Sequence, residues 1–289
     1  MTNSSEPIQL VQAATKGRIK HSIVPWCFEL FGEKWGIEKI CQVAAQLGCE
    51  SVELVKPEDY PTLKKYGLTC AIGMVDMNPD PPFIKGFNNP AYWPRVVQAT
   101  AKAIDTAADF GTPSVIAFTG YSFRNADDSD SGQMSREEGA QNCVDGLKKV
   151  IGRAEAKNVT ICLEMLNTRD DSTPMNGHPG YQGDDLDWCI DIIKRVGSPR
   201  LKVLFDIYHV QIMHGDVIRR IRDHREYLGH VHTAGVPGRH ELDDVQEVNY
   251  RGVMQALVEV GYTGYVGHEF IPTRDPLAGL RQAVTVCDV

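Results

Sequence analysis

Short strand-like apolar runs alternate with helix-like segments along nearly the whole chain, and this alternation is the feature that most constrains the fold. In the helix-like segments the apolar residues recur at intervals of three and four. We expect strands at residues 21–28, 51–55, 69–77, 114–119, 160–166, 201–209, 229–234 and 265–271. We expect helices at residues 37–47, 61–66, 91–110, 136–157, 185–196, 217–227, 253–260 and 276–286.

Eight strand–helix units in 289 residues favour a single (β/α)8 barrel, the TIM barrel, over an open doubly wound sheet. The segments after the expected strands are long, for example residues 120–135 and 167–184, whereas those after the helices are short. In a barrel the loops after the strands form the catalytic face, so this asymmetry predicts an enzyme. We expect one barrel over residues 19–289, preceded by a loosely ordered lead-in at residues 1–18.

Composition limits which binding partners and which cellular compartment are expected for this chain. Thirty Lys+Arg against 38 Asp+Glu give a net charge of −8, which argues against nucleic acid or an anionic membrane as partner. The sequence has no apolar run long enough to span a membrane, and its first residues do not resemble a secretory signal. Its eight cysteines form no C-x-x-C pair, which is typical of reduced thiols. We therefore expect a cytoplasmic protein that acts on a small molecule.

Each of the last four expected strands carries a metal-capable residue at or near its end: Glu164, Asp206, His232 and Glu269. In a barrel these strand ends converge at one mouth. Each residue alone could have a purely structural role, as a carboxylate paired with a cation at the rim or as a hydrogen-bonded histidine in the core. Together, three carboxylates among apolar residues need a compensating cation. Three oxygens and one nitrogen suit Mn²⁺, Mg²⁺ or Co²⁺, with Zn²⁺ as a further candidate.

The motifs LEMLN, FDIYHVQ, HVHTAGVPGRHE, EVNY and GHEFIPTR resemble the hydroxypyruvate isomerase family of xylose isomerase-like barrels. The resemblance runs from about residue 21 to residue 283 and is most specific over residues 164–272. It implies a divalent metal, 1,2-proton transfer on a small hydroxy-carbonyl compound, and a homo-oligomer. The family's four ligands fall on the four residues above. His232 is a departure, because bacterial hydroxypyruvate isomerases often have Gln there, whereas the related ketose 3-epimerases have His.

The resemblance also implies residues that contact the substrate. His209 matches a substrate-binding histidine of the epimerases, and Arg239 in PGRHE resembles a substrate-contacting arginine. The alternative for Arg239 is a rim salt bridge with Glu241 or Asp243. His178, in the long loop after the fifth expected strand, is either part of a lid over the substrate or an exposed loop residue.

Three residues nearer the N-terminus are further candidates. Glu53 is assigned to substrate binding, with a rim residue paired to a cation as the alternative. Trp26 and Phe28 end the first expected strand, where they either line the pocket or pack in the core.

The chemistry of such an isomerase requires a carboxylate that takes a proton from one carbon and returns it to the next. We expect Glu269 to be the base and Glu164 its acid/base partner, with the order between them open. Asp206 and His232 are expected to be ligands only. The leading reaction is hydroxypyruvate to tartronate semialdehyde. The alternatives are a ketose 3-epimerase acting on free keto-sugars, an inosose-type dehydratase and a non-catalytic sugar-binding barrel.

Overall fold

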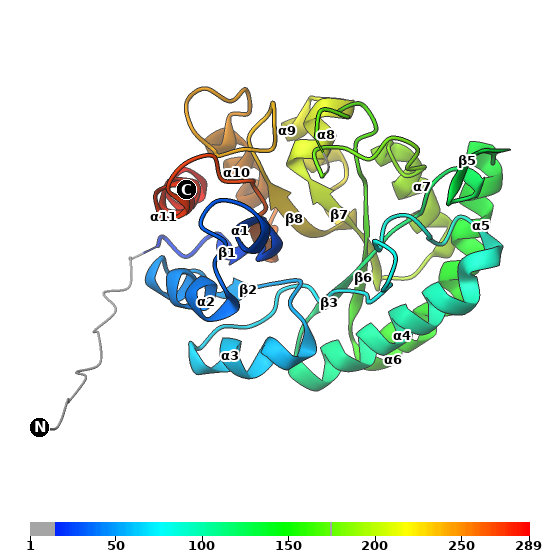
Figure 1. Cartoon of the computed structure of the whole chain (residues 1–289), viewed down its shortest axis with the longest axis horizontal. Coiled ribbons are helices and arrows are strands. Elements are labelled where there is room, and N and C mark those ends of the chain that lie inside the picture. The colour runs from blue at the N-terminus through cyan, green and yellow to red at the C-terminus, as the bar shows by residue number, and fades with distance from the viewer. Residues whose placement is uncertain (1–14, 174) are drawn as a thin grey trace, which may run out of the picture.

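Parallel strands line the centre of the molecule and helices surround them (Figure 1). The computed structural model describes residues 15–173 and 175–289. Its main sheet has the order β2-β1-β9-β8-β7-β6-β3, and every neighbouring pair is parallel. The strands are β1 (Lys20–Ile23), β2 (Ser51–Val52), β3 (Ser114–Ala117), β6 (Thr160–Glu164), β7 (Leu201–Asp206), β8 (Leu228–Thr233) and β9 (Tyr265–His268).

The eighth position of the barrel is occupied by residues 69–73, which close the ring between β2 and β3. They pair through isolated parallel bridges, Ser51 with Thr69 and Gly73 with Val115. Between these bridges, the Ala71 amide donates to Ser51 Oγ and the Ala71 carbonyl accepts from Ser114 Oγ, both at 2.8 Å. Because serine hydroxyls replace backbone partners there, the expected strand at 69–77 is not continuous. The predicted (β/α)8 barrel is confirmed.

The outer helices follow the strands as expected. They are α2 (Ile37–Gln46), α3 (Tyr60–Lys65), α4 (Trp93–Phe110), α5 (Arg136–Lys148), α6 (Ile151–Lys157), α7 (Leu186–Val196), α9 (Val217–Asp223), α10 (Tyr250–Glu259) and α11 (Pro276–Cys287). Helix α7 shows why they form: Asp185 caps its first turn, and Leu186, Cys189, Ile190 and Ile193 bury one stripe. The single helix expected at 136–157 is two helices, α5 and α6.

Most of the expected strands end earlier than predicted, and two of them continue as a short helix on the catalytic side. The first is followed by α1 (Trp26–Leu30), which lies inside the ring of outer helices near β1 (Figure 1). Pro25 has no N–H for the ladder, and its carbonyl accepts from the amides of Phe28 and Glu29. The second is followed by α8 (Ile207–Met213), whose first amides donate to the side chain of Asp206. His209 therefore lies on a helix and not on a strand.

Short 3-10 turns and one hairpin complete the described chain. The turns span Pro57–Asp59, Pro90–Tyr92 and Arg225–Tyr227, and the hairpin pairs β4 (Phe123–Asn125) with β5 (Asp128–Gln133). All eight cysteines are buried and unbridged, as expected. Within the described residues, no helix is both long and apolar enough to span a membrane. Residues 1–14 of the expected lead-in lie outside the described ranges.

Candidate metal centre and active site

The four metal-capable residues meet at the carboxyl end of the barrel. Glu164 and Asp206 are the last residues of β6 and β7, and His232 on β8 is in register with Asp206. Glu269 directly follows β9, and its amide donates to the Thr233 carbonyl at 3.0 Å. One ligand atom from each of the four lies within 4.8 Å of the others, and all four side chains are buried. The convergence expected from the sequence is thus present.

The side chain of His232 tests whether a cation fits this cluster. Its Nδ1 lies 2.9 Å from Glu269 Oε2 and 3.8 Å from Glu164 Oε1. The contact with Glu269 is close but poorly aligned, so within residues 15–173 and 175–289 this buried nitrogen has no hydrogen-bond partner. Burial opposes protonation of His232, but the carboxylates around it raise its pKa well above the ordinary value, so this cluster favours a positive charge at its centre. One imidazole and three carboxylates are a donor set that suits a divalent cation.

The carboxylates of this cluster differ in their electrostatics. Burial and the charge of Glu269 raise the pKa of Glu164, and burial raises that of Asp206 despite Arg239 nearby. Burial also opposes ionisation of Glu269, but Arg239 and His232 outweigh it and hold its pKa well below the ordinary value. Glu269 is therefore the carboxylate most readily ionised, and Glu164 retains a proton more easily.

Arg239 points into the site and not to the rim. Its Nη2 lies 2.6 Å from Glu269 Oε2 and 3.5 Å from Asp206 Oδ2, and its guanidinium lies between the rings of Trp26 and Tyr208. Gly238 and Arg239 both have positive φ, so the PGRHE segment makes a turn that directs the arginine inward. The alternative of a rim salt bridge does not hold, because Arg239 pairs with these carboxylates instead.

His209 lies beside Asp206 with a defined orientation. Its Nδ1 accepts from the Asn167 amide at 3.1 Å, so the ring proton is assigned to Nε2. Nε2 lies 3.6 Å from Asp206 Oδ2, and among the described residues it has no hydrogen-bond partner. Burial lowers the pKa of His209 well below its ordinary value, so the ring is neutral. Asn167, the last residue of LEMLN, was missed at the sequence level, although a polar residue just past a strand end is a signal for it.

A cavity of about 240 Å³ opens beside the cluster. Five of the candidates named from the sequence line it, namely Glu164, Glu269, Arg239, His178 and Trp26. The rest of its wall is apolar: Leu54, Met74, Val75, Pro82, Phe83, Ile116, Phe118, Leu166 and Met175. Most of the cavity wall is thus hydrophobic, and the charged groups of the cluster make up the remainder.

His178 and the two aromatic candidates have separate places. His178 is buried against Phe83, with ring centroids 4.3 Å apart, so it is part of the cavity wall and not an exposed loop residue. Trp26 lines the cavity and donates from Nε1 to Glu269 Oε1 at 2.7 Å. Phe28 packs in the core, stacked on Trp35.

Glu53 lies away from the cavity wall, behind His232. It is fully buried, and its Oε1 lies 2.7 Å from His232 Nε2 and 2.9 Å from His230 Nε2. This position does not bring Glu53 to a substrate in the cavity, in contrast to the expected substrate-binding role. Its partner His230 was not predicted, although it alternates with His232 along one strand face.

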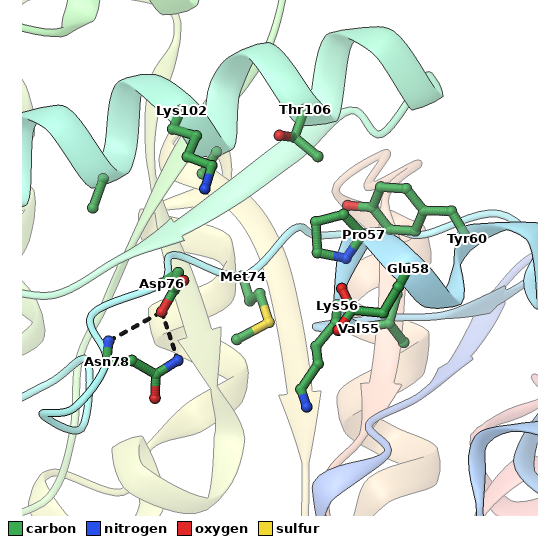
Figure 2. Close-up of a pocket in the computed structure, with 12 residues that line it drawn as sticks. Val55, Lys56, Pro57, Glu58, Tyr60, Met74, Asp76, Asn78, Lys102 and Thr106 are labelled. Carbon is green, nitrogen blue, oxygen red and sulfur yellow. Dashed lines mark hydrogen bonds between the residues drawn. The ribbon is translucent and has the colours of Figure 1, made fainter.

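A second hollow of about 370 Å³ lies on the outer side of Met74, between α4 and the loops after β2 and residue 73 (Figure 2). Lys102 and Thr106 of α4 face it from one side, and Asp76, which accepts two hydrogen bonds from Asn78, borders another. Met74 lines both this hollow and the cavity beside the cluster.

Comparison with known proteins places this geometry in a family. The family model described as xylose isomerase-like TIM barrel matches residues 41–287. A solved structure of an AP endonuclease, family 2, from Brucella melitensis superposes with a TM-score of 0.76. It is 23% identical in sequence and covers 91% of this chain and 97% of its own. Likeness at this identity establishes the fold alone.

Two curated relatives confirm the resemblance indicated by the motifs. The 2-oxo-tetronate isomerase of Cupriavidus necator is 39% identical over 137 residues, which are 47% of this chain and 50% of that protein. A human protein provisionally named hydroxypyruvate isomerase is 34% identical over 137 residues, 47% of each chain. The chain thus spans about half the length of these relatives. With the family match across most of its length, this chain belongs to the xylose isomerase-like TIM barrel family.

Proposed function

We propose that this chain is a divalent-metal-dependent isomerase that moves a proton between adjacent carbons of a short 2-oxo hydroxy acid. Hydroxypyruvate, giving tartronate semialdehyde, is the leading substrate, and the names of the relatives extend the class to a four-carbon 2-oxo-tetronate. One observation carries the proposal: two carboxylates of the four-residue cluster, Glu164 and Glu269, line the same cavity.

The metal would be held by Glu164, Asp206, His232 and Glu269. When bound, Mn²⁺, Mg²⁺ or Co²⁺ (with Zn²⁺ as a further choice) would stabilise the negative charge that develops on the substrate oxygens during proton transfer. The burial of the cluster excludes water and strengthens each of these interactions.

The two glutamates divide the proton transfer. Glu269 is ionised, and its two oxygens are oriented by Trp26 and Arg239, so it takes the proton from carbon. The same proton is returned to the neighbouring carbon, with Glu164, which lines the same cavity, as the acid/base partner. This division agrees with the order preferred from the sequence.

Other residues of the site bind the substrate. His209 presents its Nε2–H toward the cluster, where it donates to a substrate hydroxyl or carbonyl oxygen. Arg239 supplies positive charge for a substrate carboxylate, and His178 closes the cavity beside Phe83.

A ketose 3-epimerase is the second candidate. It is favoured by a histidine, not a glutamine, at position 232, since the resemblance associates histidine there with the epimerases. The apolar wall from Leu54 to Phe118 also gives a longer substrate a surface to pack on.

Solvent deuterium exchange distinguishes these functions. The Mn²⁺- or Mg²⁺-loaded protein is incubated in D₂O with hydroxypyruvate, a 2-oxo-tetronate or a ketohexose, and NMR follows deuterium entering carbon-bound positions. We expect metal-dependent exchange into the 2-oxo acids that Glu269→Gln lowers by about 10²-fold or more. Exchange at C3 of the ketose would assign the epimerase instead, and no exchange in any compound would reject both.

A further inference from the structure

A second buried cluster lies in the barrel interior directly behind the proposed metal site. It consists of Glu53, His230 and His232, and each side chain is at most 1% exposed. Glu53 Oε1 forms hydrogen bonds with both imidazoles, at 2.7 Å from His232 Nε2 and 2.9 Å from His230 Nε2. His232 thus belongs to both clusters, with Nε2 toward Glu53 and Nδ1 toward the three carboxylates of the mouth.

The contact with Glu53 determines which nitrogen of His232 is free to bind a metal. An ionised carboxylate only accepts hydrogen bonds, so the nitrogen that faces it carries the proton. Glu53 Oε1 lies within hydrogen-bond distance of two imidazole nitrogens, which is the arrangement of a carboxylate oxygen that accepts from both. With Nε2 held by Glu53, the nitrogen left for a metal is Nδ1, which faces Glu164 and Glu269.

The barrel leaves space for this contact at one glycine. Gly267 on β9 is in register with His232 on β8. A Cβ at position 267 would lie 2.5 Å from Glu53 Oε1 and 2.8 Å from His232 Cδ2, closer than real Cβ atoms approach such groups. Glycine is therefore required where the pair meets, and an isolated glycine within a strand is a known sign of such a close approach. Glu53, His232 and Gly267 fit together as one unit, although they come from three different parts of the chain.

We infer that Glu53 is a positioning residue of the metal centre, which fixes the ring of His232 with Nδ1 as the ligand atom. The inference rests on the metal site proposed above. Partners that hold a ligating histidine through its second nitrogen typically contribute about 10- to 100-fold to metal affinity. Glu53 acts through His232 and does not contact the substrate.

The test measures Mn²⁺ affinity, read from the electron paramagnetic resonance of free Mn²⁺ during titration of the whole chain. Glu53→Gln keeps the size of the side chain but turns an N–H of the amide, or a weaker acceptor, toward one of the two imidazoles. We expect Mn²⁺ to bind this variant about 10- to 100-fold more weakly than the wild type. Thr233→Val is the matched control, because it removes one equally buried hydrogen bond, between Thr233 Oγ1 and His268 Nδ1 at 3.0 Å. We expect its affinity to stay within about twofold.

A second measurement separates positioning from general loss of structure. In the Mg²⁺-loaded wild type, nitrogen NMR should show the His232 proton on Nε2, and this signal should be lost or shifted in Glu53→Gln. Gly267→Ala places a methyl group from the neighbouring strand β9 against the contact between Glu53 and His232, and it should also weaken Mn²⁺ binding. It provides an independent variant if Glu53→Gln does not fold.

The outcomes are separable. If the wild type binds Mn²⁺ and Glu53→Gln binds it equally well, the role of Glu53 is wrong and the metal proposal stands. Equal weakening in Glu53→Gln and Thr233→Val would also reject a specific role. A wild type that binds no Mn²⁺ would overturn both the metal proposal and this inference.

Discussion

The two halves of the barrel contribute different things to the same cavity. Glu164, Asp206, His232 and Glu269 lie at or next to the ends of the late strands β6 to β9, and they carry most of the charge of the site. The early half supplies most of the hydrophobic wall, with Leu54, Met74, Val75, Ile116 and Phe118 among its residues. The difference indicates that separate segments of the chain provide the reactive groups and the surface that selects the substrate. Mutations in the two halves should therefore affect different properties of the protein.

The largest contrast is expected in the stability of the metal-free protein. Phe118→Ala in the early half removes a buried aromatic ring and should lower the free energy of unfolding by about 3 kcal/mol or more. Glu164→Gln in the late half removes a desolvated carboxyl close to other carboxylates, and at pH 8 it should raise the free energy of unfolding by about 2 kcal/mol. Urea denaturation in EDTA measures both. Loss of stability in Glu164→Gln would contradict the view of the late half as a strained cluster of like charges.

The next effect is a pH dependence confined to the late half. The pKa of Glu164 is raised to about 7 and that of Asp206 to about 6. A raised carboxyl pKa stabilises the metal-free fold fully below the unfolded value of about 4, and this stabilisation is lost as pH rises through the folded pKa. Metal-free stability should therefore fall between about pH 4 and pH 7.

Metal affinity should change in the opposite direction over the same range. Both carboxyls must lose their protons to act as ligands, so Mn²⁺ affinity should rise about 10- to 100-fold from pH 5.5 to pH 7.5. Calorimetric titration at several pH values checks this. A flat profile would mean that Glu164 and Asp206 are already ionised or do not bind the metal.

The smallest effect is expected from the early half on substrate choice. Met74→Ala would enlarge the cavity at the residue that also lines the outer hollow of Figure 2. It should shift kcat/KM in favour of longer over three-carbon substrates by about 10-fold or less, mainly through KM. Steady-state kinetics with three- and four-carbon 2-oxo acids measures the ratio. A large fall in kcat for every substrate would show that the two halves are not separable in this way.

Much of the site was predictable because the barrel imposes it. Residues at the ends of parallel strands must converge, so the cluster of four followed from the order of elements alone. Errors arose where a local contact ended a strand. Pro25 and the cap made by Asp206 start helices within runs that look like strands, which moves His209 from a strand to α8. The serine hydroxyls around Ala71 interrupt the third expected strand, and they come from segments far away in the sequence.

By itself the sequence determined the repeated strand–helix pattern, and through it the barrel, its catalytic face and the residues that meet there. Hydrophobic periodicity is a local property that predicts each helix and strand, and the barrel topology then determines where the ends of those strands lie. Only the tertiary structure decided how individual side chains are used. It directed Arg239 inward and placed Glu53 behind His232 and not in the cavity. Such contacts depend on distances between segments that the chain order does not specify, and on the space left by a single glycine on a neighbouring strand.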